Sequence, residues 1–199
     1  MNFLAHAYLS FNEPEILVGN IISDFVKGKT KFSYPPGIQK GISLHRAIDE
    51  FTDKHEATIE AKQFFRPAYG LYASAFIDIT YDHFLANDLN IFRSKKNLAD
   101  FSMETLQILD NFTQHFPGHF GLMFPYMKSE NWLYNYHSQD GIFRSFGGLV
   151  RRAAYLSDSA PAEHILVENY ESLQLCYNRF FPDLVDFASH QLNELLSAD

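Results

Sequence analysis

The segment Gly41–Asp53, GISLHRAIDEFTD, places His45 and Asp49 four residues apart inside a helical pattern of apolar residues. Residues at this spacing share one face of a helix, with Cβ atoms about 5–6 Å apart. Ile38 and Ile42 precede the pair on the same face, which predicts that the pair points inward. A buried carboxylate without a partner is costly. Two explanations are open: a His–Asp hydrogen bond that holds two helices in register, or a metal site with further ligands on other helices.

Apolar residues recur at intervals of three and four along most of the chain, and few stretches alternate strictly between apolar and polar residues. This periodicity is typical of helices, so we expect an all-α protein. A chain of 199 residues can hide roughly 70% of its unfolded surface in one domain. We therefore predict a single-domain helical bundle over residues 1–199, with many aromatic side chains in its core.

Prolines, glycines and polar turns divide the chain into the expected helices. The pattern predicts helices over residues 14–28, 36–53, 55–65, 67–87, 97–116, 140–157, 163–181 and 183–196, with an aromatic-rich stretch over 124–136. The ends expected before Pro67 and at Pro182 follow from the missing N–H group and the bulky ring of proline.

Charge and cysteine content exclude several classes of protein. The formal net charge of -8 argues against general nucleic-acid binding, which needs an accessible basic surface. Cys176 is the single cysteine, so no intramolecular disulfide forms, which fits a reducing compartment. The chain shows no leader pattern and no segment apolar enough to span a bilayer. We expect a soluble, cytoplasmic protein with no membrane partner, and the sequence leaves the oligomeric state open.

Two other expected helices also carry polar residues one turn apart among apolar neighbours. Asn20 and Asp24 form one such group, and Asp78, Asp82 and His83 form the other. A bundle that turns these faces inward collects carboxylates and imidazoles, which a cation would join. Mixed oxygen and nitrogen donors suit Mn²⁺, Mg²⁺ or Fe²⁺ better than a thiolate zinc site. The three groups together favour a metal site over a structural polar network.

Five segments carry a resemblance to a known family: NFLAHAYL (2–9), GNIISDFVKG (19–28), YPPGIQKGISLHRAID (34–49), DITYDHFL (78–85) and SENWLYNY (129–136). They resemble the acyl carrier protein phosphodiesterases, also called acyl carrier protein hydrolases, in order and over most of the chain. The resemblance implies a helical fold similar to HD-type metal-dependent phosphohydrolases, although this motif reads Asp-His. It also implies Mn²⁺-dependent removal of the 4′-phosphopantetheine arm from holo acyl carrier protein. Tyr8 stands where family members often have a second histidine.

Carried over residue by residue, the resemblance selects nine positions: His6, Asn20, Asp24, His45, Arg46, Asp49, Asp78, Asp82 and His83. The expected metal ligands are Asp24, His45, Asp82 and His83. The expected catalytic set is Asp24, His6, Asp78 and Asp49. In that set Asp78 is a ligand or a base, and Asp49 orients His45 through its other ring nitrogen. His6 is either the acid for the leaving serine oxygen or a hydrogen-bonded structural histidine.

Carrier proteins are generally acidic, so an acidic enzyme needs a local basic surface to bind one. Residues 25–48 contain no Asp or Glu, and the expected substrate-binding residues there are Lys27, Lys29, Lys31, Lys40 and Arg46, with Asn20 beside them. The alternative for this segment is an ordinary solvated loop. Arg151 and Arg152 form a second, weaker cluster that is more often an exposed helix face. Trp132 either lines a pantetheine channel or belongs to the core.

Two other functions compete with this interpretation. The same ligands would serve a phosphohydrolase that acts on a nucleotide or another small phosphoester. A non-catalytic helical binding protein would instead use the polar cluster as a satisfied core network, and it would bind no stoichiometric metal.

Overall fold

Helices account for the regular structure of residues 1–197, the part of the chain that the computed structural model describes, and these residues form no strand. The all-α prediction is therefore confirmed. The α-helices are α1 (Phe3–Tyr8), α2 (Pro14–Ile22), α3 (Pro36–Lys54), α4 (Glu56–Tyr69), α5 (Ala73–Ala86), α6 (Lys95–Asp110), α7 (Gly118–Ser129), α8 (Trp132–Asn135), α9 (Gln139–Arg152), α10 (Ala160–Glu168) and α11 (Tyr170–Ser197). Short 3₁₀ turns are η1 (Ser23–Phe25), η2 (Gly28–Ser33), η3 (Gly70–Tyr72) and η4 (Thr113–His115).

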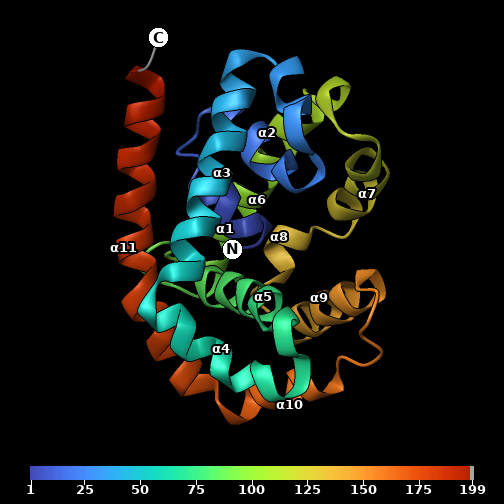
Figure 1. Ribbon diagram of the computed structural model, residues 1–199, viewed down its shortest axis with the longest axis vertical. Helices are drawn as coiled ribbons and strands as arrows, with labels where there is room; N and C mark the ends of the chain where they lie inside the picture. Colours follow the sequence, from blue (N-terminus) through green and yellow to red (C-terminus); the bar gives the residue numbers. More distant parts are fainter. Residues whose placement is uncertain (198–199) are drawn as a thin grey trace.

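Helices α2 and α3 lie side by side, and two glycines allow their backbones to touch (Figure 1). A Cβ atom on Gly19 would lie 2.1 Å from the carbonyl oxygen of Ile38, and one on Gly41 would lie 2.3 Å from that of Ile16. Neither backbone oxygen can move aside while its helix stays intact. The close approach brings the polar residues of α2 within reach of those on α3.

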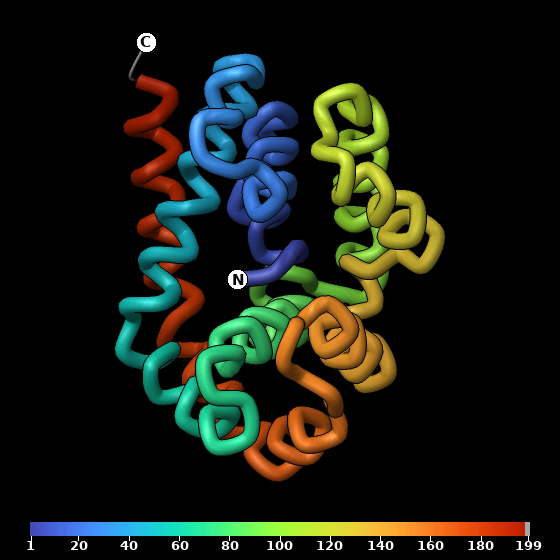
Figure 2. The backbone as a smooth tube through the Cα atoms, turned by 45° about the vertical axis from the view of Figure 1, so that its right-hand side comes forward, coloured from blue at the N-terminus to red at the C-terminus, as the bar shows by residue number. Residues whose placement is uncertain are grey.

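Helix α5 runs through the centre of the molecule and contacts α1, α4, α9 and α11. Its last eight residues, 79–86, are all buried, including Asp82 and His83. A helix that is covered on every side has no solvent face, which explains why its periodicity is weak. Figure 2 shows the amino-terminal segment entering the middle of the fold next to this helix.

Two expected helix ends were wrong, both at prolines. Helix α4 continues through Pro67 to Tyr69, and α11 continues through Pro182 for a total of 28 residues. Proline costs a helix one hydrogen bond, but α11 packs along both α3 and α4 and so gains burial on either side of Pro182 (Figure 1). Tertiary packing outweighs the local effect of the proline here.

Other boundaries shift by several residues. Helix α2 ends at Ile22 and gives way to η1, whereas the pattern predicted one helix as far as Gly28. Helix α9 ends at Arg152, five residues before the predicted end. Within residues 1–197, no helix combines the length and the apolar character needed to cross a membrane.

Candidate metal centre

Two histidines from different helices stack at the junction of α1, α2 and α3. His6 lies on α1 and His45 on α3; both side chains are buried, and their ring centroids are 4.0 Å apart with an angle of 15° between the planes. His6 Nε2 and His45 Nε2 both lie within 3.2 Å of an oxygen of Asp49. The two Nε2 atoms therefore face the same small volume.

Asn20, fully buried on α2, sets the orientation of both rings. Its side-chain Nδ2 donates to the carbonyl oxygen of His6 (2.9 Å) and to Ser10 Oγ (3.1 Å), so its Oδ1 is an acceptor, 2.7 Å from His6 Nδ1. Its backbone carbonyl oxygen accepts from His45 Nδ1 at 2.7 Å. Both Nδ1 atoms therefore carry hydrogen, and both Nε2 atoms are left to face the cluster. Asn20 was predicted to bind substrate; the structure places its side chain in the interior, where it contacts His6 and Ser10.

Two carboxylates lie opposite the Nε2 atoms. Asp49 Oδ2 is 3.0 Å from His45 Nε2, and Asp49 Oδ1 is 3.2 Å from His6 Nε2. Asp24, on η1, places Oδ1 3.1 Å from His45 Nε2, with 71% of its side chain exposed. Asp49 was predicted to orient His45 through the other ring nitrogen. That nitrogen bonds to the carbonyl of Asn20, so Asp49 lies on the ligand side of the ring instead.

The two histidines differ in charge when no cation is bound. Burial opposes a charge on His45, but hydrogen bonds to Asp24 and Asp49 outweigh it and raise its pKa to about 9. Burial lowers the pKa of His6 to about 4, and the nearby charge on His45 adds to this effect. His6 is thus neutral near pH 7 when no cation is bound, and its role as the acid for the leaving serine oxygen stays a prediction. Burial opposes ionisation of Asp49, but the positive charge at Met1 and the contacts with His45 and His6 hold its pKa well below its usual range.

The donor set fits a divalent cation. Ligand atoms of His6, His45 and Asp49 all lie within 4.8 Å of one another. His6 Nε2 is buried and, with the ring hydrogen on Nδ1, it makes no hydrogen bond to the described residues although Asp49 Oδ1 lies 3.2 Å away. A buried polar atom without a partner is costly, and a metal ion would satisfy it. Two imidazole nitrogens with carboxylate oxygens suit Mn²⁺, Fe²⁺ or a similar ion. Binding would displace the proton that His45 holds.

Asp78 borders this cluster from α5. Its Oδ1 lies 3.0 Å from the backbone nitrogen of Met1, which is in turn 3.5 Å from Asp49 Oδ1. Burial raises the pKa of Asp78, and Met1 opposes that shift. The structure therefore brings Asp78 to the edge of the centre, one group away from Asp49.

Two of the four predicted ligands lie elsewhere in the fold. Asp82 Oδ2 accepts from the backbone N–H of Leu4 at 2.7 Å, and Oδ1 accepts from those of Asn2 and Ala5 at 3.2 Å each. Asp82 thus caps the first turn of α1, where N–H groups have no partner within the helix. Burial raises its pKa to about 7 against these donors.

His83 points about 100° away from Asp82 around α5. Its Nδ1 donates to the carbonyl oxygen of Tyr136 at 2.7 Å, and its Nε2 is 2.9 Å from the Tyr170 hydroxyl. Both ring nitrogens thereby join α5 to Tyr136, which follows α8, and to α11. The structure does not bring His83 together with His6, His45 and Asp49, and its role as a ligand stays a prediction.

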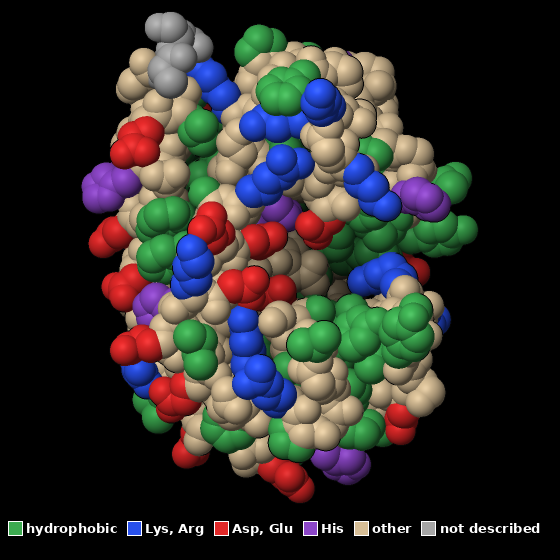
Figure 3. All heavy atoms as spheres, viewed as in Figure 1, with side chains coloured by type: hydrophobic (Ala, Val, Ile, Leu, Met, Phe, Trp, Pro, Cys, Tyr) green, Lys and Arg blue, Asp and Glu red, His purple; other side chains and the backbone are tan. Residues whose placement is uncertain are grey.

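The predicted basic surface lies next to Asp24. Lys27 and Lys29 are exposed, and Lys31 is half-buried and donates to Ser43 Oγ on α3. The guanidinium group of exposed Arg46 donates to the carbonyl oxygen of Val26 at 3.4 Å. Lys40 is half-buried on α3. Figure 3 shows acidic side chains around a hollow, with basic side chains on the surface above it.

A groove of about 1080 Å³ leads away from the centre. It is lined by Asp24 and Lys27, by apolar residues of α7 such as Leu122 and Met123, and by Trp132 and Arg152. Trp132 is half-buried, so it belongs to a groove wall as well as to the packed interior. The sequence left open whether this residue lines a channel or belongs to the core.

Comparisons with known proteins agree with the geometry. The family model described as acyl carrier protein phosphodiesterase matches residues 1–184. A Yersinia pestis protein with that name is 30% identical over 191 residues, which is 96% of this chain and 99% of the relative. Proteins with the same name from Escherichia coli O139:H28 (strain E24377A / ETEC) and O9:H4 (strain HS) give the same identity and coverage. No solved structure was found to match, so the HD-like fold stays a prediction. The chain belongs to the acyl carrier protein phosphodiesterase family.

Proposed function

We propose that this protein is a metal-dependent phosphodiesterase that removes the 4′-phosphopantetheine group from holo acyl carrier protein. The observation that carries the proposal is the pair of stacked histidines whose Nε2 atoms face Asp49, with Asp24 beside His45 Nε2. Relatives that cover the whole chain are named for this activity. The products would be apo carrier protein and 4′-phosphopantetheine.

His6, His45, Asp49 and Asp24 would hold the cation, with Mn²⁺ as the expected ion and Mg²⁺ or Fe²⁺ as alternatives. A divalent cation there would polarise a phosphoryl oxygen and lower the pKa of water. Asn20 keeps the lone pairs of both Nε2 atoms available by holding hydrogen on both Nδ1 atoms. Its role is that of a positioning residue.

Two further residues have proposed roles at the edge of the centre. Asp78 is placed to accept a proton or to complete the ligand set, because it lies one group away from Asp49. Arg46 is exposed one residue after His45, with its guanidinium group near Val26, and would bind the phosphate of the substrate.

The surface around Asp24 suits an acidic protein substrate. Lys27, Lys29 and Lys31 lie within seven residues of Asp24 in the sequence, and the groove with apolar walls begins at Asp24 and Lys27. A carrier protein would bind to the lysines by charge complementarity. Its pantetheine arm, which is extended and uncharged, would lie in the groove. A cytoplasmic location belongs to the same proposal, in line with a single, buried cysteine.

The direct test is the intact mass of holo carrier protein after incubation with chelator-treated enzyme, with and without added Mn²⁺. The proposal predicts loss of the arm only when metal is present. Asp49→Asn should abolish that loss, because it removes a charged ligand from the centre. Glu50→Gln is the matched control: Glu50 is the next residue on α3, is exposed and pairs with Lys54, so its activity should equal that of the wild type.

The competing functions give different results in the same experiment. A small-phosphoester hydrolase would leave the carrier intact while hydrolysing a small phosphodiester in a metal-dependent way. A non-catalytic binding protein would leave both intact and would bind no stoichiometric metal. Either result would overturn the proposal.

A further inference from the structure

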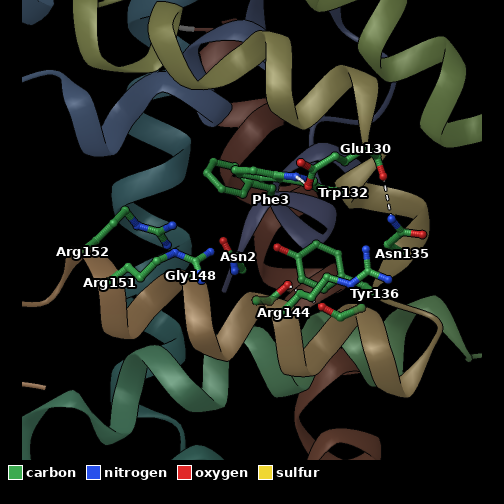
Figure 4. A pocket seen from close by; sticks show the side chains of 12 residues that line it. Asn2, Phe3, Glu130, Trp132, Asn135, Tyr136, Arg144, Gly148, Arg151 and Arg152 are labelled. Carbon is green, nitrogen blue, oxygen red and sulfur yellow. Dashed lines mark hydrogen bonds between the residues drawn. The ribbon is translucent and has the colours of Figure 1, made fainter. Parts of the chain in front are cut away.

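Helix α9 turns three arginines toward one cleft (Figure 4). Arg144, Gly148 and Arg151 are separated by four and three residues, so they share one helix face, and Arg152 lies at its edge. The sequence indicated only that Arg151 and Arg152 were neighbours on an exposed face. The spacing back to Arg144 was the signal that could have found the cluster.

The cleft has the size of a small-molecule site. Its volume is about 360 Å³, within the range of pockets that hold small ligands. Phe3 of α1, Trp132 and Tyr136 supply aromatic walls opposite α9, and Asn2 lies at its inner end (Figure 4). Aromatic surface with several cationic groups suits a ligand that has both an organic portion and a negative charge.

The three guanidinium groups have no carboxylate partner among residues 1–197. One acid, Glu130, lines the cleft, and its Oε2 accepts from Trp132 Nε1 at 3.0 Å. Arg151 and Arg152 are also close together. A Cβ atom on Gly148 would lie 3.4 Å from Arg152 Nη1 and 3.6 Å from Arg151 Nη2, so both guanidinium groups lie near the same point of the helix surface. Partial burial lowers the pKa of Arg152; Tyr136 opposes this shift, and the charge on Arg151 adds to it.

Close like charges repel each other, and a bound anion would remove that repulsion. Guanidinium groups bind phosphate oxygens through paired hydrogen bonds, which gives both charge and geometric selectivity. The cleft also adjoins the groove that Asp24 lines, because Trp132 and Arg152 line both. A ligand could therefore extend from one into the other.

We propose that this arginine cleft binds a phosphate monoester attached to a small organic group. Its identification as released 4′-phosphopantetheine rests on the proposed function, whereas the binding of an organic phosphate does not. A concave site of this volume favours a small molecule over a protein surface. A phosphate monoester carries more negative charge than the diester from which it is released, so three arginines would favour product over substrate.

The chain's single tryptophan makes binding directly measurable. Trp132 lines the cleft, so its fluorescence should change saturably when 4′-phosphopantetheine is added to metal-free protein. Pantetheine, which lacks the phosphate, should bind at least about tenfold more weakly. Inorganic phosphate should compete with 4′-phosphopantetheine, but with lower affinity because it lacks the organic portion.

Substitution identifies the site. Arg151→Gln combined with Arg152→Gln should weaken 4′-phosphopantetheine binding by about tenfold or more. Arg93→Gln is the matched control, since Arg93 is exposed and lies outside the cleft, and its affinity should equal that of the wild type. All three arginines are exposed, and unchanged circular dichroism would confirm folding of each variant.

The proposal would be overturned by equal affinity for pantetheine and 4′-phosphopantetheine, by unchanged binding in the double variant, or by the absence of binding in calorimetry. It would also be overturned if apo carrier protein, but not 4′-phosphopantetheine, changed Trp132 fluorescence. Because binding is measured without metal and without turnover, its failure leaves the proposed hydrolysis standing. Failure of hydrolysis with binding intact would remove only the identification of the ligand as the product.

Discussion

Asn20→Ala should weaken both the fold and the metal centre, by amounts that the hydrogen bonds predict. Substitution removes three side-chain contacts, with His6 Nδ1, the His6 carbonyl oxygen and Ser10 Oγ. At about 1 kcal/mol for each buried hydrogen bond, the free energy of unfolding should fall by about 3 kcal/mol. The backbone contact from Asn20 to His45 remains, so the loss at the centre falls on His6 alone.

The second effect of Asn20→Ala is on metal affinity. Without Asn20 Oδ1, His6 is free to move its hydrogen to Nε2, the atom that would bind metal. Loss of a group that orients a ligand typically costs 10–100-fold in affinity, so Mn²⁺ binding measured by calorimetry should weaken by about that factor. Chemical denaturation of the metal-free protein gives the stability separately.

Two controls separate these effects. Ser102→Ala removes a buried hydrogen bond between α6 and Asn131, far along the chain from the centre, and should lower stability without changing Mn²⁺ affinity. Ser10→Ala removes a partner of Asn20 but keeps the contact to His6 Nδ1, and should also bind Mn²⁺ normally. If Asn20→Ala lost stability and still bound Mn²⁺ with wild-type affinity, the argument from the tautomers would be refuted.

Three further predictions follow from particular contacts. Gly41→Ala should lower the free energy of unfolding by about 3 kcal/mol in a denaturant titration, because the new Cβ would lie 2.3 Å from a backbone oxygen of α2. Gly118 has open space around it, so Gly118→Ala should show no measurable loss in the same titration. Asp82→Asn should lower the midpoint of thermal unfolding but keep the wild-type Mn²⁺ stoichiometry, and loss of bound metal would show that Asp82 is a ligand after all. Changing Lys27, Lys29 and Lys31 to Glu should reduce the rate of hydrolysis of holo carrier protein at least about tenfold and leave the rate on a small phosphodiester unchanged. Lys95→Glu with Lys96→Glu on α6 is the control. Equal rates on the carrier for the wild type and the triple variant would contradict docking at this surface.

The sequence predicted the residues of the centre better than their roles. The one-turn spacing of His45 and Asp49 on α3 placed both at the cluster, and the helical pattern of α2 placed Asn20 and Asp24 beside them. Spacing defines a shared face within one helix. It does not define which group on another helix meets that face.

Helix α5 shows this limit most clearly. Asp78 and Asp82 share a face by spacing, yet Asp82 binds the first turn of α1 and Asp78 borders Asp49. The contact between Asp82 and Leu4 joins residues 78 positions apart, and helical periodicity carries no information at that range. The position of His83 was hard to predict for a related reason: a helix that is buried on all sides has no solvent face, so the pattern does not show which neighbour each residue meets.

The role of His6 could not be read from local pattern because α1 has only six residues. A helix of that length spans less than two turns and shows no reliable periodicity. At the prolines, local chemistry gave a definite prediction that tertiary packing overrode. Helix breaks were predicted at Pro67 and Pro182, but the packing of α4 against α11 keeps both helices continuous.

The central claim is that His6 and His45 bind one divalent cation through Nε2 with Asp49 beside them. Pulsed electron paramagnetic resonance of Mn²⁺ bound to protein with ¹⁵N-labelled histidine tests it most directly. Two coupled imidazole nitrogens should appear in the wild type, and one should be lost in His6→Ala. Bound Mn²⁺ with no histidine coupling, or with couplings that survive both His6→Ala and His45→Ala, would contradict the claim.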